Sequence, residues 1–165
     1  MLMKELRFPD ALRAVLAELN CGLFLWFLRQ LSGIDRLMSD PYYIEGGYHM
    51  VGNGGRLGIH ADFSHHSYTA LERRLNLLLY LNPKWKAEWG GALRLYDQAL
   101  NPSPPIWPVM NRCVIFATSE TSYHGHPEPM RLPAGVMRRS LALYYYSAPR
   151  PERSPHRAIF PKPTP

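Results

Sequence analysis

A histidine and an aspartate two positions apart, His60 and Asp62, are the side chains best suited to chemistry in this sequence. Residues two apart in a strand project from the same face, so both could bind one metal ion. A second histidine from a distant strand would complete a set of two imidazoles and one carboxylate. That set is typical of non-haem Fe(II) sites and leaves metal positions open. By spacing alone, either His124 or His126 could supply the ligand, because both lie on one face of a short segment.

Two other histidines, His65 and His66, follow the candidate pair closely. They lie in the polar stretch 64–67 and are expected to be solvated loop side chains rather than ligands. The candidate pair itself follows the glycine-rich stretch 52–55, which places it where a strand leaves a turn.

Arg138 is the candidate anion-binding residue. Alternation along a strand puts it on the same face as Ser140, Ala142 and Tyr144, whereas Arg139 shares the opposite face with two leucines. The small residues beside Arg138 leave room for a ligand. An arginine that points into a cavity needs an anion there, because an unpaired buried charge is costly. The guanidinium fork matches a carboxylate through two parallel hydrogen bonds.

Composition and length are those of one globular domain. The 165 residues are 46% hydrophobic and 19% charged, which excludes disorder of the whole chain. The net charge is +6, and residues 149–165 supply half of it. Two lone cysteines, Cys21 and Cys113, make no disulfide framework and favour a reducing compartment. With neither a signal-peptide pattern nor a long apolar run, the chain is expected to be cytoplasmic and away from membranes.

The pattern of apolar residues predicts helices followed by many short strands. Residues 9–33 show helical spacing, interrupted at 20–22 and ended by Gly33. Strands are expected at 48–51, 57–62, 74–81, 92–96, Val109, 113–118, 122–126 and 138–147. Eight short strands favour a mainly β fold, the double-sheet jelly roll, with the helical segment packed on it.

This organisation predicts one domain over residues 1–148, with helical support at 9–33 and a jelly-roll core at 42–148. Residues 149–165 hold six of the sixteen prolines, so this basic tail is expected to be extended or disordered.

Four sequence blocks, taken in order, resemble a known family. They are GGRLGIHADF (54–63), RRLNLLLYLN (73–82), WGGALRLYD (89–97), and SYHGHP (122–127) followed by RRSLALYYY (138–146). Over residues 42–147 the chain is similar to the prolyl-4-hydroxylase-like branch of the Fe(II)/2-oxoglutarate-dependent dioxygenases, whose fold is a double-stranded β-helix.

The resemblance implies roles for individual residues in binding iron and 2-oxoglutarate. Iron would be bound by His60, Asp62 and His124, and the placement of residues 116–122 favours His124 over His126. Arg138 would hold the far carboxylate of 2-oxoglutarate, and Tyr80 would donate a hydrogen bond to the same group. Asn76 shares a face with Tyr80 by alternation and is a further hydrogen-bonding candidate. Where family members often carry another tyrosine, about ten residues before the first histidine, this chain has Met50.

The activity implied is hydroxylation of an unactivated C–H bond with release of succinate and CO2. Fe(II), 2-oxoglutarate and O2 would take part, and ascorbate is a candidate additional ligand. The substrate expected from the family is a prolyl residue of a protein or peptide, with small molecules as a second class.

Two other readings compete with this activity. A degenerate jelly-roll module would bind without turnover. The chain is shorter than its relatives before the first block, and a homodimer is one way to cover a side left open. Nucleic-acid demethylation is not favoured, because RRSLAL lacks the asparagine and the second spaced arginine of that branch.

Overall fold

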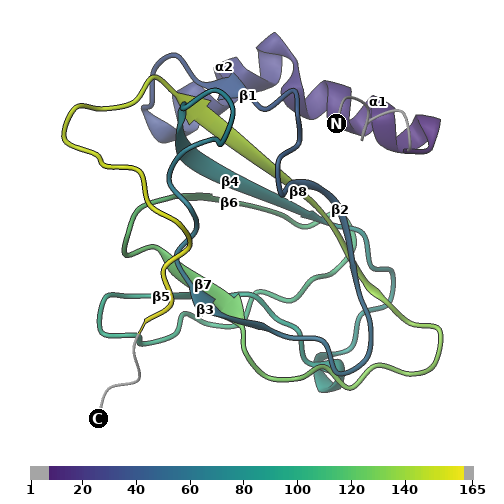
Figure 1. Ribbon diagram of the computed structural model, residues 1–165. Coiled ribbons are helices and arrows are strands. Elements are labelled where there is room, and N and C mark those ends of the chain that lie inside the picture. Colours follow the sequence, from purple (N-terminus) through teal and green to yellow (C-terminus); the bar gives the residue numbers. More distant parts are fainter. Residues whose placement is uncertain (1–7, 162–165) are drawn as a thin grey trace.

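Two antiparallel sheets form the body of the structure (Figure 1). A computed structural model describes residues 8–161. Its helices are α1 (Asp10–Asn20) and α2 (Gly22–Ser32), with a short 3₁₀ helix η2 (Ala87–Trp89). Its strands are β1 (Met38–Ser39), β2 (Gly47–Val51), β3 (Leu57–His60), β4 (Glu72–Tyr80), β5 (Arg94–Tyr96), β6 (Cys113–Ala117), β7 (Tyr123–His126) and β8 (Arg138–Ser147).

The larger sheet is built around the long strands β4 and β8. The order is β1-β8-β4-β6, and β2 pairs with β8 beside β1. Residues of β8 alternate between two environments, as the sequence predicted: Arg138, Ser140, Ala142 and Tyr144 line the inner cavity. Leu141, Leu143 and Tyr145 belong to the apolar core on the outer face. One strand therefore separates the packed core from the candidate site.

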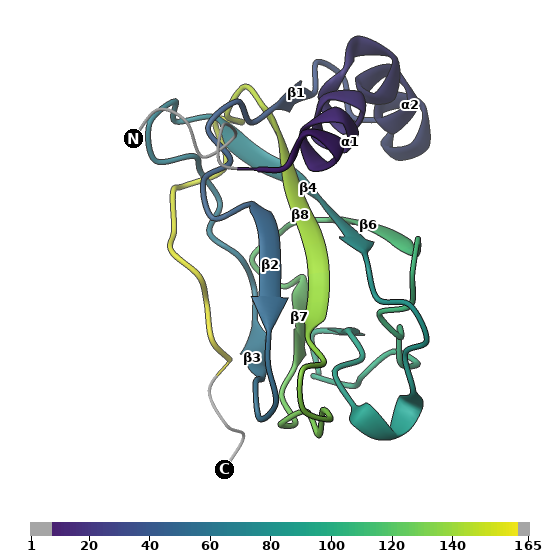
Figure 2. The ribbon, with the colours of Figure 1, turned by 90° about the vertical axis from the view of Figure 1, so that its right-hand side faces the viewer.

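The two helices cover the outer face of this sheet (Figures 1 and 2). Leu16 of α1 and Leu28 of α2 are completely buried in the core cluster. The helices are separate because Cys21 is extended, and α2 ends where Gly33 adopts a left-handed conformation with φ 68°. That conformation suits glycine at a helix end. The predicted helical segment, with its break and its stop, is thus confirmed.

The helices also bear on membrane association. Among the described residues, no single helix is long and apolar enough to cross a membrane. Only the pair α1 and α2, bent by 50°, meets the requirement of length and composition when the two are taken together.

Most predicted strands are present, with two differences. Val109 lies in a tight loop before a turn at Asn111 rather than in a strand, and the short strand β1 was not predicted. The expectation that His66 is solvated was wrong, because the side chain is only 3% exposed. Its Nε2 lies 3.1 Å from Asp40 Oδ1, and its Nδ1 accepts the backbone N–H groups of Tyr68 and Thr69.

The smaller sheet, in the order β3-β7-β5, carries the candidate histidines. Within it, Gly125 lies where β7 passes very close to β3. An added Cβ would stand 2.8 Å from the carbonyl oxygen of Leu57 and 2.9 Å from that of Gly58. Backbone atoms cannot yield as a flexible side chain could, so only glycine fits between His124 and His126.

We therefore predict that Gly125→Ala lowers the free energy of unfolding by about 1–3 kcal/mol, the range for overpacking in a close-packed interior. Thermal and urea unfolding, followed by circular dichroism, would measure it. Gly58→Ala is the matched control, because a Cβ there meets nothing within 4 Å. Equal stability of the two variants would contradict the close approach of β3 and β7.

Candidate metal centre

Three side chains with metal-binding atoms converge at one end of the small sheet. Ligand atoms of His60, Asp62 and His124 all lie within 4.8 Å of one another. Within residues 8–161, these three form the cluster of His, Cys, Asp or Glu side chains that could hold a metal ion. His60 Nε2 is 3.5 Å from Asp62 Oδ1, and His124 Nε2 is 3.4 Å from Asp62 Oδ2. Two imidazoles and one carboxylate suit a divalent iron ion and leave coordination positions open.

Strand register brings the two histidines together. His60 is the last residue of β3 and lies directly opposite His124 in the antiparallel pair β3–β7. Their ring centroids are 4.5 Å apart. His60 Nδ1 is 2.8 Å from the carbonyl oxygen of Gly58, and His124 Nδ1 is 3.1 Å from that of Ser122. Because a carbonyl only accepts, each Nδ1 carries the proton, and each Nε2 is left as the lone-pair donor that a metal needs.

Asp62 is fixed by two donors from β4. Arg73 Nη2 donates to Asp62 Oδ2 at 2.9 Å, and Asn76 Nδ2 donates to the same oxygen at 2.7 Å. Arg73 Nε also donates to Asn76 Oδ1, so the pair forms a unit. Burial alone would raise the pKa of Asp62. The interaction with the neighbouring His60 ring, the charge of Arg73 and the hydrogen bond from Asn76 outweigh it and hold the pKa well below its usual value.

The pKa values of the two histidines shift in opposite directions, although Asp62 raises and Arg73 lowers both of them. Burial disfavours the charged form of both, and it lowers the pKa of His124. For His60 the hydrogen bonds to Asp62 and to the Gly58 carbonyl overcome burial, so the pKa is raised. The ligand set is thus one ionised carboxylate with two imidazoles of unequal basicity.

Arg73 was not among the predicted site residues, although it is completely buried beside the candidate metal ligands. Its guanidinium carbon lies 3.4 Å from the centroid of the Tyr144 ring and 4.5 Å from that of Phe63. The register of β4 against β8 shifts between Arg73 and Leu75. This bulge brings Arg73 to the same site as Asn76, three positions away, which strict alternation does not predict.

A cavity of about 220 Å³ opens beside the ligands and reaches Arg138 on its other wall. Arg138 Nε donates to the Gly91 carbonyl at 2.9 Å, and its Nη2 donates to the Tyr80 hydroxyl at 3.3 Å. No acidic side chain among residues 8–161 forms an ion pair with Arg138. Burial lowers its pKa. A buried arginine without a carboxylate partner marks a place for an anion.

His126 lines the same cavity and was left out of the ligand set by the sequence argument. The residue is buried, and its Nδ1 has no hydrogen-bond partner among the described residues. Burial and the nearby charge of Arg138 lower the pKa of His126 to about 4. The ring is therefore neutral at physiological pH and has an unsatisfied nitrogen beside the buried arginine.

The remaining predicted residues occupy supporting positions. Tyr80 has no exposed surface, and its hydroxyl contacts Arg138 rather than lining the cavity. Asn76 lines the cavity, but its side-chain NH2 donates to Asp62. At the place of the missing family tyrosine, Met50 is exposed and His49 lines the cavity instead.

Comparison with known families agrees with this geometry. The family model of the 2OG-Fe(II) oxygenase superfamily matches residues 46–146, an interval that contains the three candidate ligands and Arg138. The chain therefore belongs to the 2OG-Fe(II) oxygenase superfamily. Membership in this superfamily supports an oxygenase and implies Fe(II), 2-oxoglutarate and O2 as its cofactors, and His60, Asp62 and His124 could hold the iron. The resemblance drawn from the four sequence blocks is confirmed.

Two solved structures have a similar fold. A prolyl 4-hydroxylase of Pseudomonas putida is 20% identical with a TM-score of 0.56, and the match covers 87% of this chain and 70% of that one. A prolyl 4-hydroxylase from Phytophthora capsici has the same identity and TM-score, with 85% and 46% covered. This likeness confirms the predicted jelly roll. A search of the curated proteins found no match.

We predict that Asn76→Ala weakens metal binding about 10- to 100-fold, the usual cost of removing a hydrogen bond to a ligand. The variant removes one of the two donors that orient Asp62 toward His60 and His124 and leaves Arg73 alone to hold it. Loss of the free Mn²⁺ EPR signal on titration would measure the dissociation constant, with Mn²⁺ standing in for Fe²⁺.

Asn82→Ala is the matched control for this substitution. Asn82 is also a buried asparagine, but it binds the carbonyl oxygens of Pro108 and Arg139, away from the ligands. The control should lower stability without changing the dissociation constant. An equal loss of affinity in both variants would contradict a specific role for Asn76.

Proposed function

We propose that this chain is a 2-oxoglutarate-dependent hydroxylase in which His60, Asp62 and His124 hold the iron. One observation carries the proposal: a cluster of two histidines and one carboxylate shares a cavity with a buried, uncompensated arginine. The first group binds a divalent cation, and the second binds the far end of a dicarboxylate. The chemistry that iron supplies here is the activation of O2, coupled to decarboxylation of 2-oxoglutarate to succinate, for hydroxylation of a C–H bond.

Arg138 is assigned to the far carboxylate of 2-oxoglutarate. Its guanidinium is held in place by the carbonyl of Gly91 and the hydroxyl of Tyr80, so the remaining N–H groups can point at a ligand. His126 is assigned to the same carboxylate, because its neutral ring can donate a hydrogen bond from the unpartnered Nδ1. Tyr80 acts through Arg138 in this arrangement, and the direct bond predicted for it stays a prediction.

The protein residues around the metal have separate tasks. Arg73 and Asn76 keep Asp62 ionised and oriented toward His60 and His124. Leu78, Leu93 and Phe116 line the cavity with apolar surface. An apolar wall limits the water that reaches the reacting groups and strengthens the electrostatic interactions among them.

The proposed substrate class is a prolyl residue in a peptide or protein. Its support is the fold shared with the two prolyl 4-hydroxylases, which are named for that reaction. A small molecule that reaches the same cavity is the second class. Mass spectrometry after turnover would show whether one oxygen atom has been added to a peptide or to a metabolite, and would thus distinguish the two substrate classes.

The metal assignment predicts a spectroscopic signature. Anaerobic addition of Fe(II) and 2-oxoglutarate should give a weak visible charge-transfer band, and His60→Ala should abolish it because one of three ligands is lost. His65→Ala is the control, since the hydrogen bond of that ring among the described residues is with Ser64 and not with a proposed ligand. A full chain that gives no band would overturn the proposed ligand set.

Turnover then separates an enzyme from a binding module. A hydroxylase should form succinate from 2-oxoglutarate in the presence of O2, at least in an uncoupled reaction without substrate. A chain that gives the band but never forms succinate would be a binding module.

The co-substrate assignment predicts that Arg138→Gln raises the dissociation constant of 2-oxoglutarate by about 30-fold or more. Loss of one member of a buried charge pair costs roughly 2–5 kcal/mol, and 1.4 kcal/mol is tenfold. His126→Leu should raise it about tenfold, since a hydrogen bond to a charged group contributes about 1.5–3 kcal/mol. Titration of the charge-transfer band would give both values.

Arg139→Gln provides the control for these titrations, because Arg139 lies next to Arg138 but on the opposite face of β8. Its side chain is not among the groups that line the cavity. A rise in the constant for Arg139→Gln as large as that for Arg138→Gln would refute the assignment.

A further inference from the structure

After the last strand of the jelly roll, the chain returns along the side that carries the candidate metal ligands. After β8 ends at Ser147, residues 149–161 run as an extended segment, here called the strap. It crosses from the large sheet to β3 of the small sheet (Figure 1). The proline-rich composition predicted an extended conformation but gave no indication of what the segment would contact.

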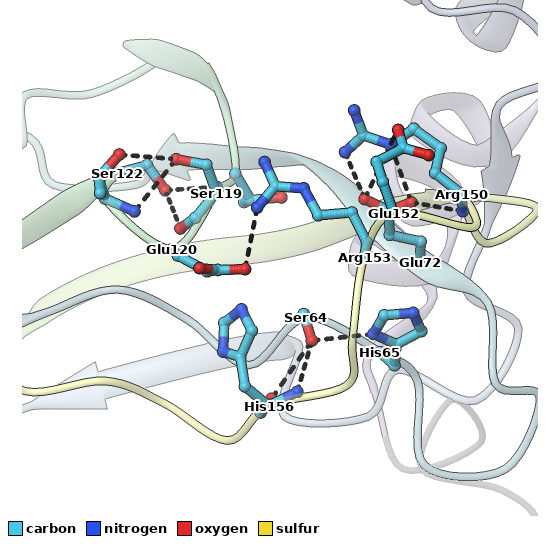
Figure 3. Close-up of polar contacts among 12 residues, drawn as sticks. Ser64, His65, Glu72, Ser119, Glu120, Ser122, Arg150, Glu152, Arg153 and His156 are labelled. Atoms are coloured by element: carbon cyan, nitrogen blue, oxygen red, sulfur yellow. Dashed lines mark hydrogen bonds and ion pairs between the residues drawn. The ribbon is translucent and has the colours of Figure 1, made fainter.

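Charged side chains fix the first part of the strap (Figure 3). Arg150 donates from its backbone N–H and its guanidinium to Glu72, a buried carboxylate at the start of β4. Burial alone would raise the pKa of Glu72, but the hydrogen bonds from Arg150 lower it. Arg153 Nη1 lies 3.1 Å from Glu120 Oε1, on the turn between β6 and β7. These contacts anchor the first part of the strap independently of the contacts that the second part makes.

The second part of the strap pairs with the segment that follows β3. His156 N–H donates to Ser64 Oγ at 2.8 Å, and Ser64 N–H donates to the His156 carbonyl at 3.1 Å. Ala61 and Ile159 exchange two backbone hydrogen bonds, each of 2.8 Å. Hydrogen-bonded pairs recur every second residue in a regular antiparallel ladder, so the contact at Ser64, three residues on, does not continue a ladder from Ala61. Ala61 and Ile159 form an isolated antiparallel bridge, which sets the local register.

That register places the strap beside two of the candidate metal ligands. Phe160 falls opposite His60, and their ring centroids are 5.8 Å apart with planes inclined by 27°. Ala61 stands between His60 and Asp62, and both of its backbone groups bind Ile159. The ladder between β3 and β7 ends at the pair His60–His124. Beyond it, the backbone at Ala61 relies on the strap for its hydrogen bonds.

We propose that the strap is a positioning element of the metal centre, with Ile159 and Phe160 as its positioning residues. Ile159 fixes the backbone between the two ligands, and Phe160 limits the rotation of the His60 ring. The inference rests on the proposed assignment of His60, Asp62 and His124 to iron. It adds that the ligand geometry depends on residues that follow the interval matched by the family.

Phe160 contributes little to the stability of the barrel itself. Its side chain is 65% exposed, and substitutions at such surface positions usually change stability by less than about 0.5 kcal/mol. A loss of metal affinity at this position can therefore be separated from a loss of the fold.

Two shortened chains test the proposal directly. A chain ending at Ala158 loses Ile159 and Phe160, and we expect Mn²⁺ to bind it about tenfold more weakly or worse, the lower end for outer partners of metal ligands. A chain ending at Phe160 keeps both residues and should bind Mn²⁺ as the full chain does. Mn²⁺ EPR titration measures both constants, and circular dichroism checks the fold.

If the shortened chain fails to fold, point variants test whether Ile159 and Phe160 position the metal ligands. Ile159→Pro removes the N–H that binds the Ala61 carbonyl, whereas Ala158→Pro alters an amide for which the described residues offer no partner. Phe160→Ala should weaken Mn²⁺ binding with an unchanged melting temperature of the metal-free protein, and Phe160→Trp should restore it.

The outcomes separate this inference from the proposed function. If the full chain binds no Mn²⁺, the proposed metal ligands are wrong. If the full chain binds it and the chain ending at Ala158 binds it equally well, the strap is not a positioning element. Equal losses in the chains ending at Ala158 and at Phe160 would also overturn the inference, because the effect would then come from residues after Phe160.

Discussion

The carboxylate of Asp62 is the largely buried charge on which the arrangement of the site depends. An ionised carboxylate is costly in a protein interior unless hydrogen bonds and an opposite charge compensate it. Arg73 and Asn76 provide both from β4, and Arg73 in turn lies against the ring of Tyr144 on β8. The end of β3 is thereby tied to the two central strands of the large sheet. All three candidate ligands come from the end of the small sheet, so this tie is what holds them in place against the large sheet, which carries Arg138.

The two buried arginines of the cavity play different roles because their charges are balanced differently. Asp62 neutralises the charge of Arg73, so Arg73 orients that carboxylate and does not attract a further anion. Arg138 has only a carbonyl and a hydroxyl as partners, so its charge is available to a ligand. This asymmetry sets the polarity of the cavity, with the metal ligands at one side and an anion-binding wall at the other. A dicarboxylate that binds the metal through one end and Arg138 through the other matches that polarity.

How far the sequence predicts the site depends on how regular each strand is. Alternation placed Arg138 correctly because β8 is continuous from Arg138 to Ser147. It missed Arg73 because the bulge in β4 breaks the alternation at that residue. The choice between His124 and His126 needed the register of β7 against β3, which spacing within one strand does not contain. The burial of His66 depends on Asp40, a partner from a distant segment that no local pattern indicates.

The strap shows the same limit on a larger scale. Its contacts join residues 78 and 92 positions apart, and each depends on a single partner such as Glu72 or Ser64. Composition predicts an extended segment but not its neighbour. Yet β3 is the edge of the small sheet, and an unpaired edge beside a functional segment is a weakness that proteins commonly cover. Here residues 156–160 pair with the segment that directly follows β3, at the point where the β3–β7 ladder stops. In the proposed metal centre, the contacts that surround the ligands therefore extend past the family match at residue 146, as far as Phe160.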